Sequence, residues 1–207
     1  MTSYKAGYRA GFAAFGATMA YVIVQLLQLV RVLRFPWDEI LIFGASLCIV
    51  IPFVLEMLAL HYTTSGEKRF WSHAALLFSV IYAVFVIANY VTQLALVIPA
   101  KRHGGYSTIR ILDQTPHSLL WNFDALGYIC MGLAMALAIP VFERGGFQKW
   151  VRLSFLANAA VTPLIAVVYF YPVYSEKLLI LGSPWAITAP LAMLLLAILL
   201  KKKYVQR

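Results

Sequence analysis

The stretch that decides the fold is residues 115–142, TPHSLLWNFDALGYICMGLAMALAIPVF. It is apolar over more than the roughly 20 residues that a helix needs to cross a bilayer. Thr115 followed by Pro116 is typical of a helix start, as N-cap and first helical residue. The stretch also contains one carboxyl group, that of Asp124. Such groups cost roughly 2.5–3.5 kcal/mol at the bilayer centre on insertion scales and usually mark a function. The sequence therefore predicts a membrane helix that carries a site.

The composition of the whole chain indicates a membrane protein. Of its 207 residues, 62% are hydrophobic and 12% are charged, and the mean hydropathy is +0.81. A soluble domain has about 25% charged residues. The apolar runs are continuous, whereas the strands of a transmembrane barrel alternate apolar and polar residues. We therefore expect an all-α, polytopic membrane protein with one domain, residues 1–207, and six transmembrane helices. The predicted spans are 9–31, 39–62, 71–98, 117–142, 149–171 and 178–200.

The net charge of +9 would suggest a nucleic-acid partner in a soluble protein. Here the Lys and Arg residues lie almost wholly between the predicted spans, so the expected partner is the lipid bilayer and no nucleic acid. Eleven of the 17 Lys and Arg residues lie on the side of the two termini and of the second and fourth loops. The positive-inside rule then places both termini in the cytoplasm of a cell with a plasma (inner) membrane. The sequence does not indicate an oligomeric state.

Polar residues form one stripe on each of three predicted helices, at helical spacing. The stripes are His117, Trp121, Asp124 and Tyr128 in the fourth span, Thr18, Tyr21, Gln25 and Gln28 in the first, and Tyr82, Asn89 and Gln93 in the third. At 1.5 Å per residue, Gln25, Asn89 and Asp124 each lie roughly 10 Å from one membrane face. Asn122 lies nearer the surface, on a neighbouring face of the fourth span.

These stripes predict a pocket in the outer half of the bundle, beneath the long connection 99–116, which binds a small molecule or an ion for transport or sensing. Its predicted ligand-binding residues are Gln25, Asn89, Gln93, His117, Trp121, Asn122, Asp124 and Tyr128.

Two other interpretations of the stripes stay open. Amide and tyrosine side chains commonly tie membrane helices together, at about 0.6 kcal/mol for each hydrogen bond, so the protein could be a structural or assembly subunit without a ligand. A membrane enzyme could instead use Asp124, His117 and Tyr128 as acid and base on a lipid-like substrate. The enzyme interpretation requires Asp124 and His117 within hydrogen-bond reach of each other.

Glu56 and Arg152 form a second candidate site, on the opposite side of the membrane from Asp124. Glu56 lies about 9 Å from the end of the second span, and Arg152 enters the fifth span from the same face. Because intramembrane charges usually pair, we expect an ion pair between them. The alternative is that Glu56 carries a proton, with Asp124 as its outward counterpart.

No cofactor and no metal is expected. Haem held by two histidines needs ligands at matched depth on facing helices, whereas the four histidines lie at span ends or in loops: His61, His73, His103 and His117. No ligand spacing typical of zinc recurs, and the motifs Gly-x-Ser-x-Gly and His-Glu-x-x-His are absent from the sequence.

Three segments together resemble a pattern of uncharacterised bacterial multi-pass membrane proteins. They are Pro116-His117-Ser118, Asp124-Ala125-Leu126-Gly127-Tyr128 and Pro140-Val141-Phe142. In that group a Pro-His pair precedes a carboxylate-x-Leu-Gly-Tyr segment and a Pro-Val-Phe helix end. The resemblance covers about a quarter of the chain. It implies the architecture and a bacterial membrane, and no activity.

Overall fold

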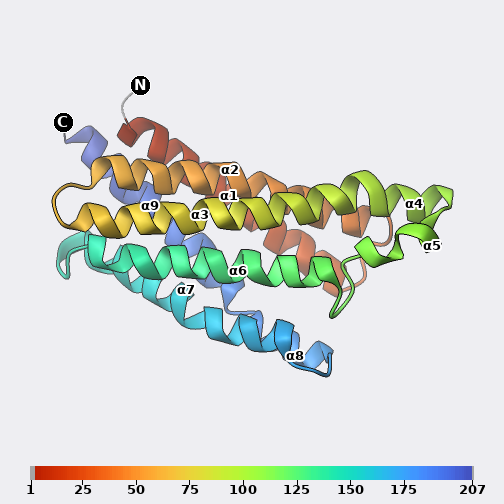
Figure 1. Ribbon diagram of the computed structural model, residues 1–207. Coiled ribbons are helices and arrows are strands. Elements are labelled where there is room, and N and C mark those ends of the chain that lie inside the picture. Colours follow the sequence, from red (N-terminus) through yellow and green to blue (C-terminus); the bar gives the residue numbers. More distant parts are fainter. Residues whose placement is uncertain (1–2, 207) are drawn as a thin grey trace.

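The computed structural model describes residues 3–206, and six of its helical segments are long and apolar enough to span a membrane (Figure 1). These segments are Ser3–Leu29, Trp37–Thr63, Lys68–His103, Leu119–Val141, Gly146–Phe170 and Lys177–Val205. No strand occurs among the described residues. The all-α class and the six expected spans are confirmed.

The spans are built from the following elements. They are α1 (Ser3–Leu29), α2 (Trp37–Thr63), α3 (Lys68–Thr92), a π-helical segment (Gln93–Val97), α4 (Ile98–His103), α5 (Tyr106–Ile109), a 3₁₀ turn (Arg110–Leu112), α6 (Leu119–Ala138), a 3₁₀ turn (Ile139–Val141), α7 (Gly146–Phe170), α8 (Glu176–Gly182) and α9 (Trp185–Val205).

The six long helices form a closed ring. Each packs against the next in the order α1, α2, α3, α6, α7 and α9, and α9 returns to pack against α1. The short connections make this order natural, because helices joined by a few residues become antiparallel neighbours. The interior of the ring is where the chain places its buried polar residues.

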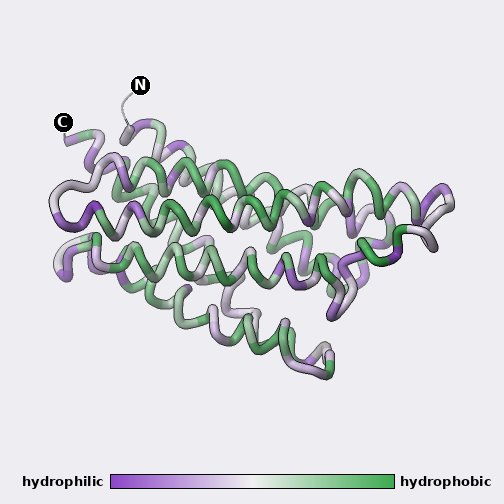
Figure 2. The backbone as a smooth tube through the Cα atoms, viewed as in Figure 1, coloured by the Kyte–Doolittle hydropathy of each residue, from purple (hydrophilic) through white to green (hydrophobic). Residues whose placement is uncertain are grey.

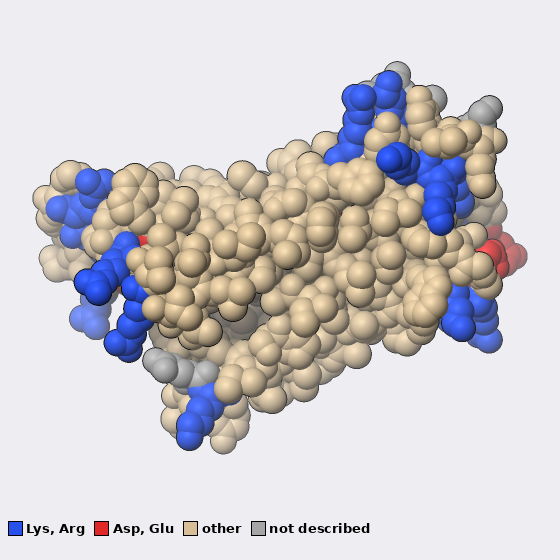
Figure 3. All heavy atoms as spheres, turned by 180° about the vertical axis from the view of Figure 1, so that it is seen from behind, with Lys and Arg blue, Asp and Glu red and all other residues tan. Residues whose placement is uncertain are grey.

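Charge and hydropathy divide the molecule into a central band and two ends. Polar residues gather at the ends of the helices, and the middle of each long helix is apolar (Figure 2). The face seen in Figure 3 carries its Lys and Arg residues in two separate groups with an uncharged band between them. Both ends of the chain lie at the same end of the bundle (Figure 1), as an even number of spans requires.

The third span is longer than predicted. We expected it to stop before Pro99, but helix continues to His103 through the π-helical segment. There the Ile98 N–H bonds the Gln93 carbonyl, five residues back. Pro99 therefore falls in the first turn of a new helical segment, where its missing N–H costs little.

Helix α6 begins later than predicted. Thr115 and Pro116 belong to a turn, and the N-cap is Ser118, whose hydroxyl accepts a hydrogen bond from the Trp121 N–H at 3.2 Å. Serine is the stronger N-cap residue. His117 takes a positive φ of 67° in this turn, so it lies outside the helix.

The last span is divided. Helix α8 ends at Gly182 and α9 starts at Trp185, with Pro184 between them. Ser183 and Pro184 both keep helical dihedral angles, but Pro184 has no N–H to donate to the preceding turn, so the helical hydrogen bonds are interrupted there.

Candidate functional site

The carboxyl group of Asp124 is the centre of a hydrogen-bonded cluster inside the ring. Its side chain is on α6, one and a half turns past the helix start, and Asp124 is only 4% exposed. One oxygen accepts a hydrogen bond from the Tyr90 hydroxyl of α3 at 2.5 Å, and the other accepts one from the Tyr169 hydroxyl of α7. The Gln114 side chain lies beside this carboxyl group as a further potential donor. We call Asp124, Tyr90, Tyr169 and Gln114 the Asp124 cluster.

Aromatic side chains cover the cluster on the side of α1 and α9. The hydroxyl groups of Tyr21 and Tyr128 are 3.0 Å apart. The ring of Trp185 packs edge-on against both, at centroid distances of 5.7 Å to Tyr21 and 4.9 Å to Tyr128. Tyrosine and tryptophan pack as apolar bodies while their polar atoms need partners. These three residues therefore tie α1, α6 and α9 together.

Trp121 holds Tyr169 in place from the other side. Its indole N–H donates to the Tyr169 carbonyl at 3.1 Å, and the two rings lie 4.6 Å apart. The Tyr169 hydroxyl is thereby positioned toward Asp124.

A small cavity lies beside the cluster. Its volume is about 10 Å³, which is about the room that one water molecule needs. The hydroxyl-bearing residues in its wall are Tyr21, Ser46, Tyr82, Tyr90 and Tyr128. This cavity has room for one water molecule.

Two amides of the third span fasten the long connection to the cluster. Asn89, fully buried, donates to the Gln114 side-chain oxygen at 2.9 Å. Gln93 donates to the Leu112 carbonyl at 2.8 Å and accepts from the Gln114 N–H at 3.3 Å. The connection therefore lies over the cluster and closes that end of the ring.

An ion-pair network closes the same end further out. The Lys101 ammonium contacts Glu39 at 2.9 Å and Asp113 at 3.1 Å. Asp113 also accepts a hydrogen bond from the Tyr106 hydroxyl at 2.6 Å. This hydrogen bond raises the pKa of Tyr106, because an ionised tyrosine beside the carboxylate would lose the bond and repel it.

The predicted ligand-binding residues are brought together only in part. Asp124, Trp121 and Tyr128 take part in the cluster or its aromatic cover, and Asn89 and Gln93 join it through Gln114. The other three do not: Gln25 and His117 are exposed, and Asn122 is half-buried on the neighbouring face of α6.

Two of these outcomes have a plain structural reason. Gln25 is exposed because α9 begins at Trp185, level with Tyr21, so α9 does not reach the next turn of α1. His117 is exposed because it precedes the cap of α6. No hydrogen bond joins His117 to Asp124 in the described chain, so the condition set for the enzyme interpretation is not met.

The expected ion pair between Glu56 and Arg152 is wrong. Arg152 donates to the Phe142 carbonyl at 3.5 Å. Within residues 3–206, neither carboxyl oxygen of Glu56 has a hydrogen-bond partner.

Sequence reasoning missed Tyr90, Tyr169, Gln114 and Trp185. Tyr169 lies near the end of the predicted span 149–171, where aromatic residues typical of the membrane interface also occur, and Tyr90 lies one residue off the predicted stripe of the third span. One signal was available for both. A tyrosine inside an apolar span needs a partner for its hydroxyl group, and Asp124 is an acceptor at similar depth.

Comparisons with known proteins found nothing similar to this chain: no family model, curated protein or solved structure matches it.

Proposed function

We propose that this integral membrane protein binds and releases a proton at Asp124 in order to transport or sense a small molecule or ion. The observation that carries the proposal is a buried carboxyl group with two tyrosine donors and no cation. Within residues 3–206 no Lys, Arg or His forms an ion pair with Asp124.

The surroundings of Asp124 suit a group that changes its protonation state. The hydroxyl groups of Tyr90 and Tyr169 stabilise a carboxylate by donating to it. A hydroxyl group also accepts a hydrogen bond after rotation, so the same partners accommodate a neutral carboxylic acid. Carboxyl groups of this kind inside membranes serve as proton relays and ion sites.

The water-sized cavity adjoins the proposed proton site within the ring. The residues that line it include Tyr90, which binds Asp124, and Tyr21 and Tyr128, whose hydroxyl groups contact each other. A larger solute requires the ring to open at α1 and α9, which carry Tyr21 and Trp185.

Infrared difference spectroscopy of the protein in lipid vesicles tests the proton site. A component of the carbonyl band of protonated carboxyl groups is expected to appear and disappear as the pH is stepped, and the Asp124→Asn variant is expected to lack that component. Glu143→Gln, at an exposed surface residue, serves as the control and keeps the band. If Asp124→Asn and the wild type give the same pH-dependent spectrum, Asp124 is not the proton site.

A pH-sensitive dye inside the vesicles separates the two uses of the site. Transport predicts that the lumen follows an imposed pH gradient faster with the wild type than with Asp124→Asn. Sensing predicts no such difference and a pH-dependent change in the fluorescence of Trp121 and Trp185, which border the site.

A structural role for the cluster is the second candidate, and one observation favours it: both oxygens of Asp124 are already hydrogen-bonded. In that case Asp124→Asn lowers the stability of the protein without removing any pH-dependent band.

The bacterial inner membrane, the cytoplasmic termini and the resemblance to bacterial multi-pass proteins remain predictions.

A further inference from the structure

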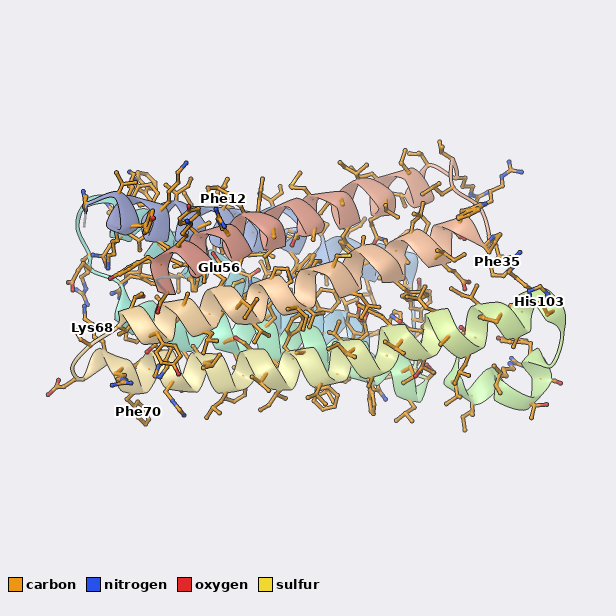
Figure 4. All side chains as sticks on the ribbon, turned by 90° about the horizontal axis from the view of Figure 1, so that it is seen from above. Phe12, Phe35, Glu56, Lys68, Phe70 and His103 are labelled. Atoms are coloured by element: carbon orange, nitrogen blue, oxygen red, sulfur yellow. The ribbon has the colours of Figure 1, made fainter. Side chains whose placement is uncertain are left out.

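A second carboxyl group, that of Glu56 on α2, is buried more completely than Asp124 and has no partner. Glu56 is 0% exposed, and within the described chain neither of its oxygens accepts or donates a hydrogen bond. Figure 4 places it beside α1, nearer the end of the bundle that carries Lys68 than the end that carries His103.

The space around Glu56 is closed by small residues. A Cβ atom at Gly11 of α1 would overlap the Glu56 carboxyl group and lie 2.7 Å from the Cβ of Ala197 of α9. One turn away, a Cβ at Gly7 would overlap Ala59 and lie 2.9 Å from Leu200. Here the three helices α1, α2 and α9 meet. We call this contact, formed by Gly7, Gly11, Glu56, Ala197 and Leu200, the Glu56 seam.

Among residues 3–206, no charged group forms an ion pair with Glu56. The ionisable residues on the neighbouring parts of the packed helices are Tyr4, Lys5, Tyr8 and Arg9 of α1, His73 and Tyr82 of α3, Lys201 and Tyr204 of α9, and His61 of α2 itself. None of them hydrogen-bonds the Glu56 carboxyl group. A buried carboxylate without a partner is far more costly than the neutral acid, so the closed seam holds Glu56 in its neutral form.

The two carboxyl groups lie in opposite halves of the ring. Tyr82 of α3 packs against Phe53, one turn from Glu56, at 5.5 Å between ring centroids. Tyr90, which binds Asp124, is a further eight residues along α3. At 1.5 Å per residue, Glu56 and Asp124 are roughly 15 Å apart along the bundle.

We propose that Glu56 is a second proton-binding site, and that release of its proton requires α1 and α9 to separate from α2. An ionised Glu56 needs water, and water reaches it only when the seam opens. The same two helices carry Tyr21 and Trp185, which cover the Asp124 cluster, so protonation of Glu56 keeps that cover closed. The link to the cover rests on the proposed function of Asp124, whereas the proton site at Glu56 does not.

Labelling with N,N′-dicyclohexylcarbodiimide tests the proton site. This apolar reagent reacts with protonated carboxyl groups in apolar surroundings, and mass spectrometry of peptides locates the adduct. Brief opening of the seam admits the reagent, so the wild-type protein in lipid vesicles is expected to acquire the adduct at Glu56 on long incubation and to acquire less of it as the pH rises. The labelling is repeated in Asp124→Asn. If the adduct at Glu56 persists in this variant, the Glu56 site does not depend on the outcome at Asp124.

Hydrogen exchange tests the opening of the seam. In the wild type, the exchange of residues 4–14 of α1 is expected to increase over the pH range in which the Glu56 adduct declines. Two variants, Glu56→Gln and Glu56→Met, are expected to abolish this increase. Glu56→Met also keeps the fold measurable, because it replaces an unpartnered carboxyl group with an apolar side chain of similar size, and its melting temperature is expected to be higher than that of the wild type. The proposal is overturned if wild-type Glu56 carries no adduct, or if α1 exchanges with the same pH dependence in Glu56→Met.

Discussion

The two buried carboxyl groups of this protein sit in the same ring of helices and have opposite surroundings. Asp124 accepts hydrogen bonds from hydroxyl groups of α3 and α7 and lies beside an amide group of the long connection. Glu56 lies against glycine and alanine and has no polar partner in the described residues. The difference shows that burial alone does not define a membrane site. A carboxyl group with donors around it tolerates both protonation states in place, whereas one without donors changes state only when the packing around it changes.

The largest expected effect tests the tight packing of the Glu56 seam. Gly11→Ala introduces a Cβ atom that overlaps the Glu56 carboxyl group, so we expect a loss of about 3 kcal/mol in the free energy of unfolding, measured by denaturant titration in detergent. Gly16→Ala is the matched control, because it lies on the same helix with open space around it and is expected to gain roughly 0.5 kcal/mol from helix propensity. Equal stabilities of the two variants would mean that the seam is loose and that packing does not isolate Glu56.

The next effect tests the donors of the Asp124 cluster. Tyr90→Phe removes one hydrogen bond to the carboxyl group and is expected to cost about 2 kcal/mol in the same titration. Tyr171→Phe serves as the control, because Tyr171 is 51% exposed and is expected to change the stability little. In a double-mutant cycle, Tyr90→Phe should cost clearly less when Asp124 is already Asn. Additive effects would show that the hydroxyl group of Tyr90 does not support Asp124.

A smaller effect concerns the amides that hold the long connection over the Asp124 cluster. Gln93→Met keeps the length of the side chain and loses the hydrogen bonds to Leu112 and Gln114, so we expect about 1 kcal/mol less protection of residues 112–118 in hydrogen exchange. Gln25→Met, the same change at an exposed amide, is expected to leave that protection as it is. If residues 112–118 are equally protected from exchange in both variants, the ion pairs of Lys101 hold the connection instead.

The comparison of Asp124 and Glu56 also shows which features of the fold and the site could be predicted from the sequence. Spans follow from apolar runs, and the side of α6 that carries Trp121, Asp124 and Tyr128 follows from helical periodicity, so both could be predicted. The helices that adjoin that side could not be predicted, because the order of the helices in the ring and the positions of their ends are set by packing. Gln25 has the right spacing on α1, yet α9 begins only at Trp185, level with Tyr21, and does not reach Gln25. The lack of a partner for Glu56 could not be predicted for the same reason. The rule that intramembrane charges pair does not apply to a carboxyl group enclosed by close packing against Gly11.

The smallest effect lies outside the spans, at the hydrogen bond from Tyr106 to Asp113 that closes the connection. Asp113 raises the pKa of Tyr106, so the neutral hydroxyl group is the form that the folded protein favours. Its contribution to stability is therefore fully present below about pH 10, the ordinary pKa of tyrosine, and is lost as the pH rises through the raised value. We expect the wild type to exceed Tyr106→Phe by about 0.5 kcal/mol at neutral pH, because a half-exposed bond competes with water, and the difference to vanish at strongly alkaline pH. Thermal unfolding of both proteins across this pH range measures it. A difference that stays constant would place the closure of this end in Lys101 and its two carboxylates.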